Sequence, residues 1–210
     1  MTDTAQQEAR EPLAEVKPSV GNKSPSRDTL LEEGVFQIVA ERPEDAAAIE
    51  ALLDVAFGPD RHRKTSYRFR DGLTPAEGLS LIALDAGTFQ GSLRFWPVQI
   101  DGAKKPLLLG PLAVDPARRG QAIGVALVRR GLRLARRLGH DWVILIGDYA
   151  YYKRFGFVHA FPHGLRFPEP VDARRFLVRR IPRGPITGIS GLVRRADGAA
   201  VSAEVVRPPS

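Results

Sequence analysis

Residues 109–127 read Leu-Gly-Pro-Leu-Ala-Val-Asp-Pro-Ala-Arg-Arg-Gly-Gln-Ala-Ile-Gly-Val-Ala-Leu, and this stretch decides the fold. Its parts are typical of a buried strand, a turn with proline, a loop of small residues and the start of a helix. Such a loop gathers backbone N–H groups at the positive end of a helix dipole, where phosphates bind. Arg118 and Arg119 add positive charge at its entrance. The stretch predicts a pyrophosphate site, although a plain strand-to-helix turn has a similar sequence.

Two common nucleotide-binding fingerprints are absent from the chain. It contains neither Gly-x-x-x-x-Gly-Lys-Ser/Thr nor Gly-x-Gly-x-x-Gly, which argues against a P-loop NTPase and a Rossmann dinucleotide site. A second informative segment follows one strand later, where residues 151–157 read Tyr-Tyr-Lys-Arg-Phe-Gly-Phe. The two segments have to be interpreted together.

Together they resemble the GNAT-type N-acetyltransferase superfamily. Residues 119–124, Arg-Gly-Gln-Ala-Ile-Gly, are similar to its Gln/Arg-x-x-Gly-x-Gly/Ala acetyl-CoA loop, and Tyr152 begins its Tyr-x-x-x-Gly-Phe signature. The resemblance extends from Val35 to Val201 and points to a bacterial subgroup of mostly uncharacterised acetyltransferases. It implies an α/β fold with a mixed central sheet, in which the fourth and fifth strands are parallel and splay apart and helices cover both faces.

The same resemblance implies acetyl-CoA as co-substrate and suggests where it binds. The backbone of the fourth strand would bind the pantetheine arm, and the loop would hold the diphosphate. The implied cofactor-binding residues are Leu112, Ala113, Val114, Arg119, Gly120, Gln121, Ala122, Ile123 and Gly124. Ala122 stands where many relatives have glycine, so its methyl group is expected to crowd the diphosphate.

By the resemblance, the reaction is transfer of acetyl to a primary amine, with Tyr152 as the general acid that protonates the leaving thiolate. Backbone N–H groups at Leu112 or Ala113 are candidate oxyanion donors. The chain contains no cysteine, so we expect direct transfer without an acyl-enzyme. The general base stays open, because the fourth strand has no acidic residue; the candidates are Asp148, Glu77, His159, His163 or a water chain.

Composition narrows the class of protein. The chain has 210 residues, no cysteine and no apolar run approaching the ~18 residues of a membrane span. Its first residues lack the basic and apolar regions of a secretory signal. The four histidines show no metal-binding spacing, so we expect no metal. We therefore expect a cytoplasmic protein without a membrane partner. The resemblance implies an acceptor that is a small-molecule or peptide amine, and we expect a monomer or a homodimer.

Positive charge is unevenly distributed. The formal net charge is +7, yet residues 1–34 carry four basic and seven acidic side chains. Residues 115–140 contain seven arginines against a single acid, Asp115. Such a field favours an acidic acceptor or a polyanion such as coenzyme A. A nucleic-acid partner is a less favoured interpretation, and an acyl-CoA-binding regulatory module without turnover is the main alternative to the enzyme.

Three segments are expected along the chain. Residues 1–34 are polar and interrupted by proline, which predicts a disordered tail. Residues 35–165 would form the acetyltransferase domain. Residues 166–210 would form an extension packed on the acceptor side of that domain. The basic run with aromatics at 60–70 would form one wall of the acceptor site by the resemblance, or otherwise an ordinary exposed helix.

Hydrophobic patterns predict the elements of the domain. Strands are expected at 35–39, 79–84, 89–100, 107–114 and 141–146, and short ones at 176–178 and 186–193. In the third strand, Leu93 and Phe95 are out of phase with Trp96, which predicts a bulge near residues 95–96. The helix after the loop should pack through Leu127, Val128, Gly131, Leu134, Ala135 and Leu138.

Overall fold

The computed structural model describes residues 36–63, 65–182 and 184–199, so the predictions for the tail at 1–34 and for the last residues lie outside the described part. The helices and short 3₁₀ turns (η) are η1 Pro43–Asp45, α1 Ala46–Phe57, η2 Pro59–Arg63, α2 Thr65–Arg68, η3 Pro116–Arg118, α3 Ile123–Arg137, α4 Tyr149–Tyr152, η4 Lys153–Phe155 and η5 Phe161–His163. The strands are β1 Gln37–Ala40, β2 Ser80–Asp85, β3 Thr88–Asp101, β4 Leu107–Val114, β5 Trp142–Ile146, β6 Val158–His159, β7 Leu165–Arg166, β8 Phe176–Arg180 and β9 Ser190–Arg195.

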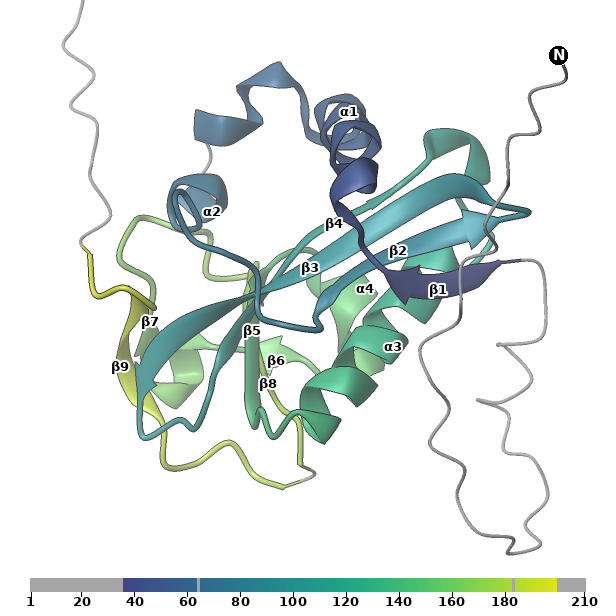
Figure 1. Cartoon of the computed structure of the whole chain (residues 1–210). Helices are drawn as coiled ribbons and strands as arrows, with labels where there is room; N and C mark the ends of the chain where they lie inside the picture. Colours follow the sequence, from purple (N-terminus) through teal and green to yellow (C-terminus); the bar gives the residue numbers. More distant parts are fainter. Residues whose placement is uncertain (1–35, 64, 183, 200–210) are drawn as a thin grey trace, which may run out of the picture.

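The described strands form one mixed sheet with helices on both faces (Figure 1). Its order is β1-β2-β3-β4-β5-β8-β6, and β9 pairs with the second half of β3. The α/β class and the parallel pairing of β4 with β5 were both predicted, and both are confirmed. Within the described residues, no helix combines the length and the apolar character needed to cross a membrane.

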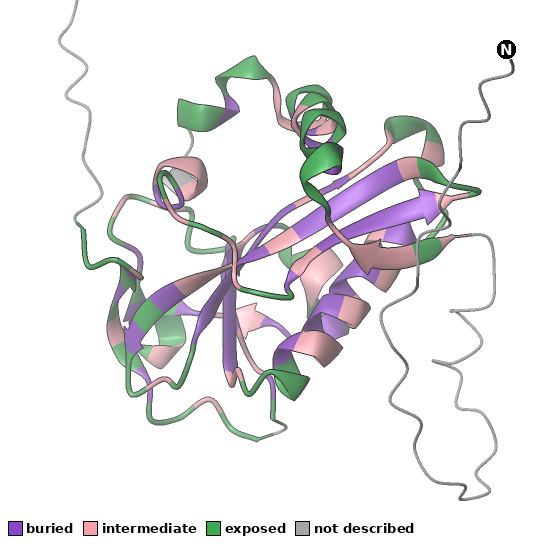
Figure 2. Cartoon of the chain, in the orientation of Figure 1, coloured by how far each residue is buried: buried purple, intermediate pink, exposed green. Residues whose placement is uncertain are grey.

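The two faces of the sheet bury separate cores. On β2, Leu81 and Ala83 point into the core under α3, whereas Ile82 and Leu84 point into the core under α1. This alternation follows from the period of two of an extended strand. In Figure 2 the middle strands are accordingly buried along most of their length. A third core joins residues of β3, β4 and β5 to residues of β7, β8 and β9.

Helix α3 is amphipathic, as predicted, but two of its expected core residues differ. Leu127, Val128, Gly131 and Ala135 are buried. Leu134 is only half-buried, and Leu138 is 44% exposed, since the helix ends at Arg137. Leu132, which the helical pattern did not include, is buried.

The expected bulge lies on β4 and not on β3. The pairing of β3 with β4 shifts between Leu93 and Phe95, where a single β3 residue, Arg94, faces both Gly110 and Pro111. The first half of β3 buries one face, with Leu93 and Phe95 under α3, and its second half buries the other face, with Val98 in the third core. Both phases of the hydrophobic pattern are therefore satisfied without a bulge at residues 95–96 of β3; the irregularity of β3 itself lies at Gln90, in its pairing with β2.

The C-terminal region contributes directly to the sheet. Residues 166–210 were expected to form an extension packed on the domain. Strand β8 from this region lies between β5 and β6, and it pairs with β5 over five residues. Strand β9 pairs with β3 at Val98↔Arg195 and Gln99↔Arg194.

Candidate functional site

The predicted pyrophosphate loop leaves several backbone donors free. Among the described residues, no hydrogen-bond acceptor is found for the N–H groups of Ile123, Gly124 and Val125, the first turn of α3. Gly120 is exposed, and no atom lies within 4 Å of the place where its Cβ would be. Free N–H groups at a helix N-terminus form a site for an anion. The loop therefore offers donors that an anion could accept from, and the pyrophosphate site stays a prediction.

Ala122 adopts an unusual conformation at the start of α3. Its φ is 61°, in the left-handed region, and it occupies the N-cap position. A glycine would adopt this φ without strain. Glycine would satisfy this backbone requirement, which alanine meets at an energetic cost of ~1–2 kcal/mol.

The two arginines at the loop entrance behave differently. Arg118 forms an ion pair with Asp85 at the end of β2. Arg119 and Gln121 are exposed beside the free N–H groups. Only Arg119 is therefore positioned as a mobile positive charge for a phosphate.

Strands β4 and β5 separate close to the loop. They pair only at Leu107↔Val143 and Leu108↔Ile144, and then diverge. Beyond Leu108, the β5-facing backbone of β4 has no strand partner among the described residues. Leu112, Ala113 and Val114 lie in this open stretch, so their position supports hydrogen bonding to an extended ligand.

Tyr152 lies at the carboxyl end of β5. Its Cε2 atom lies 2.5 Å from the position that a Cβ on Gly147 would occupy, and Gly147 directly follows the strand. The Tyr152 ring also packs on Phe157, with centroids 5.7 Å apart. Burial raises the pKa of the Tyr152 hydroxyl well above its usual range, so the phenol stays protonated at neutral pH.

The hydroxyl of Tyr151 reaches the predicted pyrophosphate loop, a contact that the sequence did not indicate. It lies 2.8 Å from the place of a Cβ on Gly124, beside side-chain carbons of Val114 and Leu112. Any residue larger than glycine at position 124 would displace this hydroxyl. The clue in the sequence was the doubled Tyr-Tyr before the Gly-Phe signature, which was interpreted as an aromatic wall.

The candidate bases are dispersed. Asp148 caps α4, where its Oδ1 accepts the N–H of Ala150 at 2.9 Å. Asp148 and His159 line one pocket together with Tyr149, Arg174 and Arg175. The His159 Nδ1 is buried there without a hydrogen-bond partner, and its ring stacks on Tyr149 at 4.3 Å. Glu77 is exposed in the loop before β2, and His163 lies in η5.

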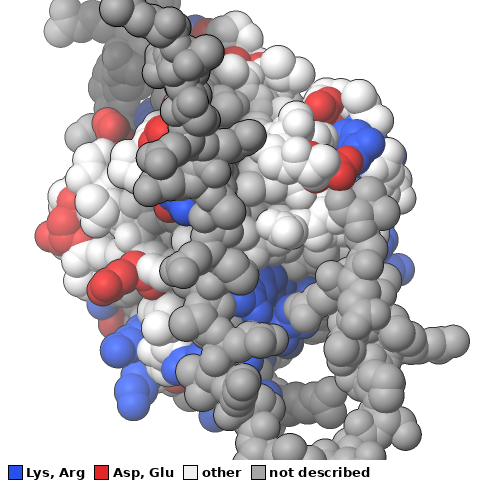
Figure 3. Space-filling view, turned by 45° about the vertical axis from the view of Figure 1, so that its right-hand side comes forward, with Lys and Arg blue, Asp and Glu red and all other residues white. Residues whose placement is uncertain are grey.

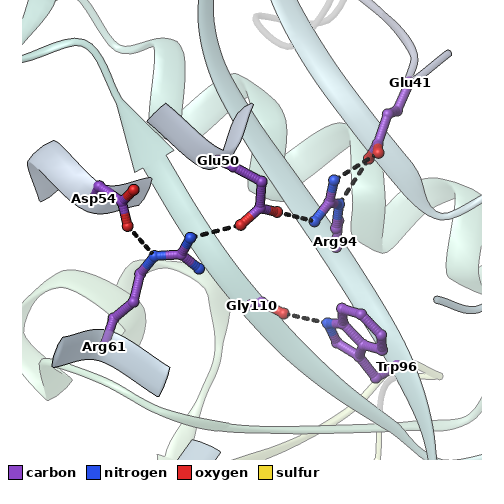
Figure 4. A network of polar contacts seen from close by, with 7 residues as sticks. All are labelled: Glu41, Glu50, Asp54, Arg61, Arg94, Trp96 and Gly110. Atoms are coloured by element: carbon purple, nitrogen blue, oxygen red, sulfur yellow. Dashed lines mark hydrogen bonds and ion pairs between the residues drawn. The ribbon is translucent and has the colours of Figure 1, made fainter. Parts of the chain in front are cut away.

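A chain of ion pairs joins α1 and the following turn to the sheet (Figure 4). Arg94 from β3 binds both carboxylate oxygens of Glu41 at 2.6 and 2.8 Å, and it contacts Glu50 at 3.3 Å. Glu50 also binds Arg61 at 2.6 Å, and Arg61 binds Asp54 at 2.7 Å. The basic run at 60–70 is thereby anchored to α1, and it is not an ordinary exposed helix, since Arg61 is only 3% exposed.

The surface of the protein carries a cluster of positive charge, as the composition predicted. Lys and Arg side chains gather on the lower half of the face in Figure 3, and acidic side chains are scattered around them. On α3, Arg136 and Arg137 are exposed. This charge attracts anionic ligands over a distance of about one Debye length, ~8 Å at physiological salt.

Comparison with known proteins agrees with this geometry. Residues 46–157 match the family model described as the acetyltransferase (GNAT) family. The chain is 37% identical over 159 residues to the uncharacterized N-acetyltransferase YhbS of Escherichia coli K12, covering 74% of this chain and 93% of YhbS. It is 29% identical over 160 residues to the uncharacterized N-acetyltransferase YjhQ of the same organism, covering 73% of this chain and 88% of YjhQ.

Two solved structures extend the comparison. The crystal structure of E. coli YhbS in complex with CoA superposes with a TM-score of 0.68 at 33% identity, covering 85% of this chain and 95% of that one. A GNAT family acetyltransferase from Brucella melitensis, in complex with acetyl-CoA, has a TM-score of 0.57 at 34% identity, covering 76% and 94% of the two chains. The chain belongs to the acetyltransferase (GNAT) family.

Proposed function

We propose that this protein transfers an acetyl group directly from acetyl-CoA to a primary amine. The observation that carries the proposal is the separation of β4 from β5 after two residue pairs, next to the free N–H groups of the α3 N-terminus. The CoA and acetyl-CoA bound by the two solved relatives support the same assignment. Bound acetyl-CoA supplies an activated thioester.

The chain's own groups have distinct tasks under this proposal. The N–H groups of Ile123, Gly124 and Val125, with Arg119, bind the diphosphate. The open edge of β4 at Leu112–Val114 holds the pantetheine arm, and an N–H at Leu112 or Ala113 stabilises the developing oxyanion.

Tyr152 is the proposed proton donor to the leaving sulfur. A donor must be protonated at the working pH, and burial keeps the Tyr152 phenol neutral. Among the described residues it has no hydrogen-bond partner that competes for this proton. Asp148 is the acidic residue nearest to it in sequence and is the preferred base candidate, acting directly or through water.

One observation favours a second candidate, an acyl-CoA-binding module without turnover. Strand β4 carries no acidic side chain, and the alternative acid Glu77 is exposed in a loop. Such a module would keep the cofactor site and lack a base.

Calorimetry and a thiol assay test the proposal together. Acetyl-CoA should bind with micromolar affinity, and a panel of amines should include some that release free CoA thiol. Tyr152→Phe should then reduce turnover by about 10²–10⁴ and leave acetyl-CoA binding intact. Tight binding with no thiol released by any amine would favour the silent module. Unchanged turnover in Tyr152→Phe would remove Tyr152 from the role of acid.

A further inference from the structure

Three arginines are buried in the described part of the chain, and one of them has no acidic partner. Arg61 pairs with Glu50 and Asp54, and Arg195 pairs with Asp197 at 2.8 Å. Arg70 is 6% exposed, yet no ion pair of the described residues includes it. A buried cation without an anion is costly for a folded protein, so its presence calls for a reason.

Arg70 is held between two aromatic rings. Its guanidinium carbon lies 4.4 Å from the centroid of Tyr67 and 5.6 Å from that of Trp96. The Tyr67 hydroxyl is buried beside the guanidinium groups of Arg70 and Arg61, where its contact acts to raise the pKa of each, and it makes no hydrogen bond of full geometry among the described residues. The ring faces offset part of the desolvation of the cation, and the Arg70 N–H donors that do not face Tyr67 are left for a ligand. Two polar groups are thus buried together with unused hydrogen-bonding capacity.

The positive charge persists at neutral pH. Burial, with contributions from Arg94 and Arg61, lowers the pKa of Arg70 to about 10, which leaves the guanidinium protonated at pH 7. The acids near those two arginines, Glu41, Glu50 and Asp54, are already bound to them.

The Arg70 guanidinium adjoins the part of β4 that β5 does not pair with. An Nη1 atom of Arg70 lies 3.7 Å from the place of a Cβ on Gly110. Trp96 donates its indole N–H to the Gly110 carbonyl at 2.6 Å, which fixes the strand at this point. Gly110 lies two residues before Leu112, in the stretch of β4 that β5 no longer covers. An acceptor amine that attacks the thioester has to arrive close to this stretch.

The C-terminal region keeps the segment around Arg70 in place. The Arg195 guanidinium donates to the carbonyls of Phe69 at 3.2 Å and Asp71 at 2.6 Å, on either side of Arg70. Glu169 forms an ion pair with Arg68. A binding group is most effective when its backbone is held in advance in this way.

We propose that Arg70 and Tyr67 form a subsite for a carboxylate, and that the acceptor of this enzyme is a small amine that carries a carboxylate near its amino group. A carboxylate matches a guanidinium better than a point anion does, because both are planar and can share two parallel hydrogen bonds. The inference rests on the proposed function for its reaction and on Arg70 and Tyr67 for its specificity.

The test compares acids with their matched amides. Free-thiol release is measured with glycine, β-alanine and 4-aminobutyrate, and with the amide of each. The amides have less basic amines, which are neutral more often, so this difference works against the proposal. We expect at least one acid to exceed its amide by about 10–100-fold in kcat/KM, the range expected for a hydrogen bond to a charged group.

Variants separate binding from folding. Arg70→Gln should equalise acid and amide by lowering kcat/KM for the acid, and Tyr67→Phe should reduce the preference by less. Arg194→Gln removes an equal charge from an exposed ion pair with Asp101 and should keep the full preference. Because Arg70 has no acidic partner in the described part of the chain, Arg70→Gln should not lower the melting temperature. A lower melting temperature with the acid preference intact would show a structural role and overturn the subsite.

The outcomes also distinguish this subsite from the general function. Acetyl-CoA binding with turnover of amides alone, or of acids and amides equally, would overturn the subsite and keep the acetyltransferase. If acetyl-CoA does not bind, the proposed function fails. In that case, calorimetry measures the binding of the three acids alone to wild type and to Arg70→Gln. The subsite is supported if an acid binds wild type and Arg70→Gln abolishes this binding, and it is refuted if none of the acids binds.

Discussion

The position of Tyr152 depends on a single missing methyl group, and Gly147→Ala tests it. An alanine Cβ at 147 would lie 2.5 Å from Cε2 of Tyr152 and 2.9 Å from Cδ1 of Leu145. Carbon atoms in contact lie about 3.5–4.0 Å apart, so the ring has to move by roughly 1 Å. Overpacking of this kind costs ~1–3 kcal/mol of the free energy of unfolding. A shift of ~1 Å at a reacting group costs about 10²-fold in turnover.

The assay is steady-state thiol release, with calorimetry and thermal unfolding on the same samples. Gly147→Ala should lose about 10²-fold in kcat while acetyl-CoA binding stays unchanged, because the diphosphate loop is elsewhere. Its melting temperature should fall by ~2–4 °C per kcal/mol. Gly131→Ala is the matched control, since its Cβ would lie 2.5 Å from Cε2 of Phe95 in the core under α3. It should lose comparable stability and keep most of its turnover.

A double variant makes the reasoning refutable. If Gly147→Ala acts by moving the Tyr152 hydroxyl, adding it to Tyr152→Phe should cost little more turnover, because that hydroxyl is already gone. Two full, additive losses would show that Gly147 affects another group. Wild-type turnover in a destabilised Gly147→Ala would show that the place of the hydroxyl is unimportant.

Three further predictions follow from single features of the site. Ala122→Gly should raise the melting temperature slightly, because relief of ~1–2 kcal/mol of left-handed strain exceeds the ~0.5–1 kcal/mol cost of glycine's freedom when unfolded; calorimetry should show tighter acetyl-CoA binding, and weaker binding would contradict the crowding argument. Turnover should rise with pH as the acceptor amine loses its proton, and no decline should set in until the pH exceeds about 10, since burial raises the pKa of Tyr152 above the ordinary ~10. The free energy of unfolding should decrease because of Tyr152 only above about pH 10, where the phenol ionises in the unfolded chain and stays protonated in the folded one. Asp148→Asn keeps the cap of α4 and should reduce turnover without loss of stability if Asp148 is the base, whereas Asp148→Ala should also lose ~1 kcal/mol of stability; equal turnover in wild type and Asp148→Asn would exclude it.

The elements that the sequence predicted well are those with a strong pattern and clear ends. Strand β4 was expected at 107–114 and is found at Leu107–Val114, because an apolar run there is bounded by Pro106 and by Asp115-Pro116. The loop was predicted from its small residues, and α3 was predicted from the separation of its apolar face from its arginine-rich face. The sixth strand, expected after the Gly156-Phe157 turn, is found as β6 at Val158–His159. By contrast β7 has two residues, too few to show a period, and it forms because β9 offers an edge to pair with.

The buried arginines could not have been predicted from local sequence. Arg63 and Arg70 belong to the same basic run, yet the side chain of Arg63 is 80% exposed and Arg70 is 6% exposed. What separates them is tertiary: Trp96 comes from β3 and Gly110 from β4, and Arg195 holds the backbone from β9. The same limit applied to Tyr151, whose contact with Gly124 joins α4 to the start of α3.

The separation of β4 from β5 also depends on residues far along the chain. A strand that leaves its neighbour after two pairs loses backbone hydrogen bonds on that edge, and a buried strand needs them replaced. Strand β5 has five pairs with β8 on its other edge, from Trp142↔Arg180 to Ile146↔Phe176. β8 therefore holds β5 in the sheet while β4 diverges. Strand β8, which holds β5 in the sheet, and Arg195, which fixes the segment around Arg70, both come from the C-terminal region. This region therefore contributes both to the proposed cofactor site and to the proposed carboxylate subsite.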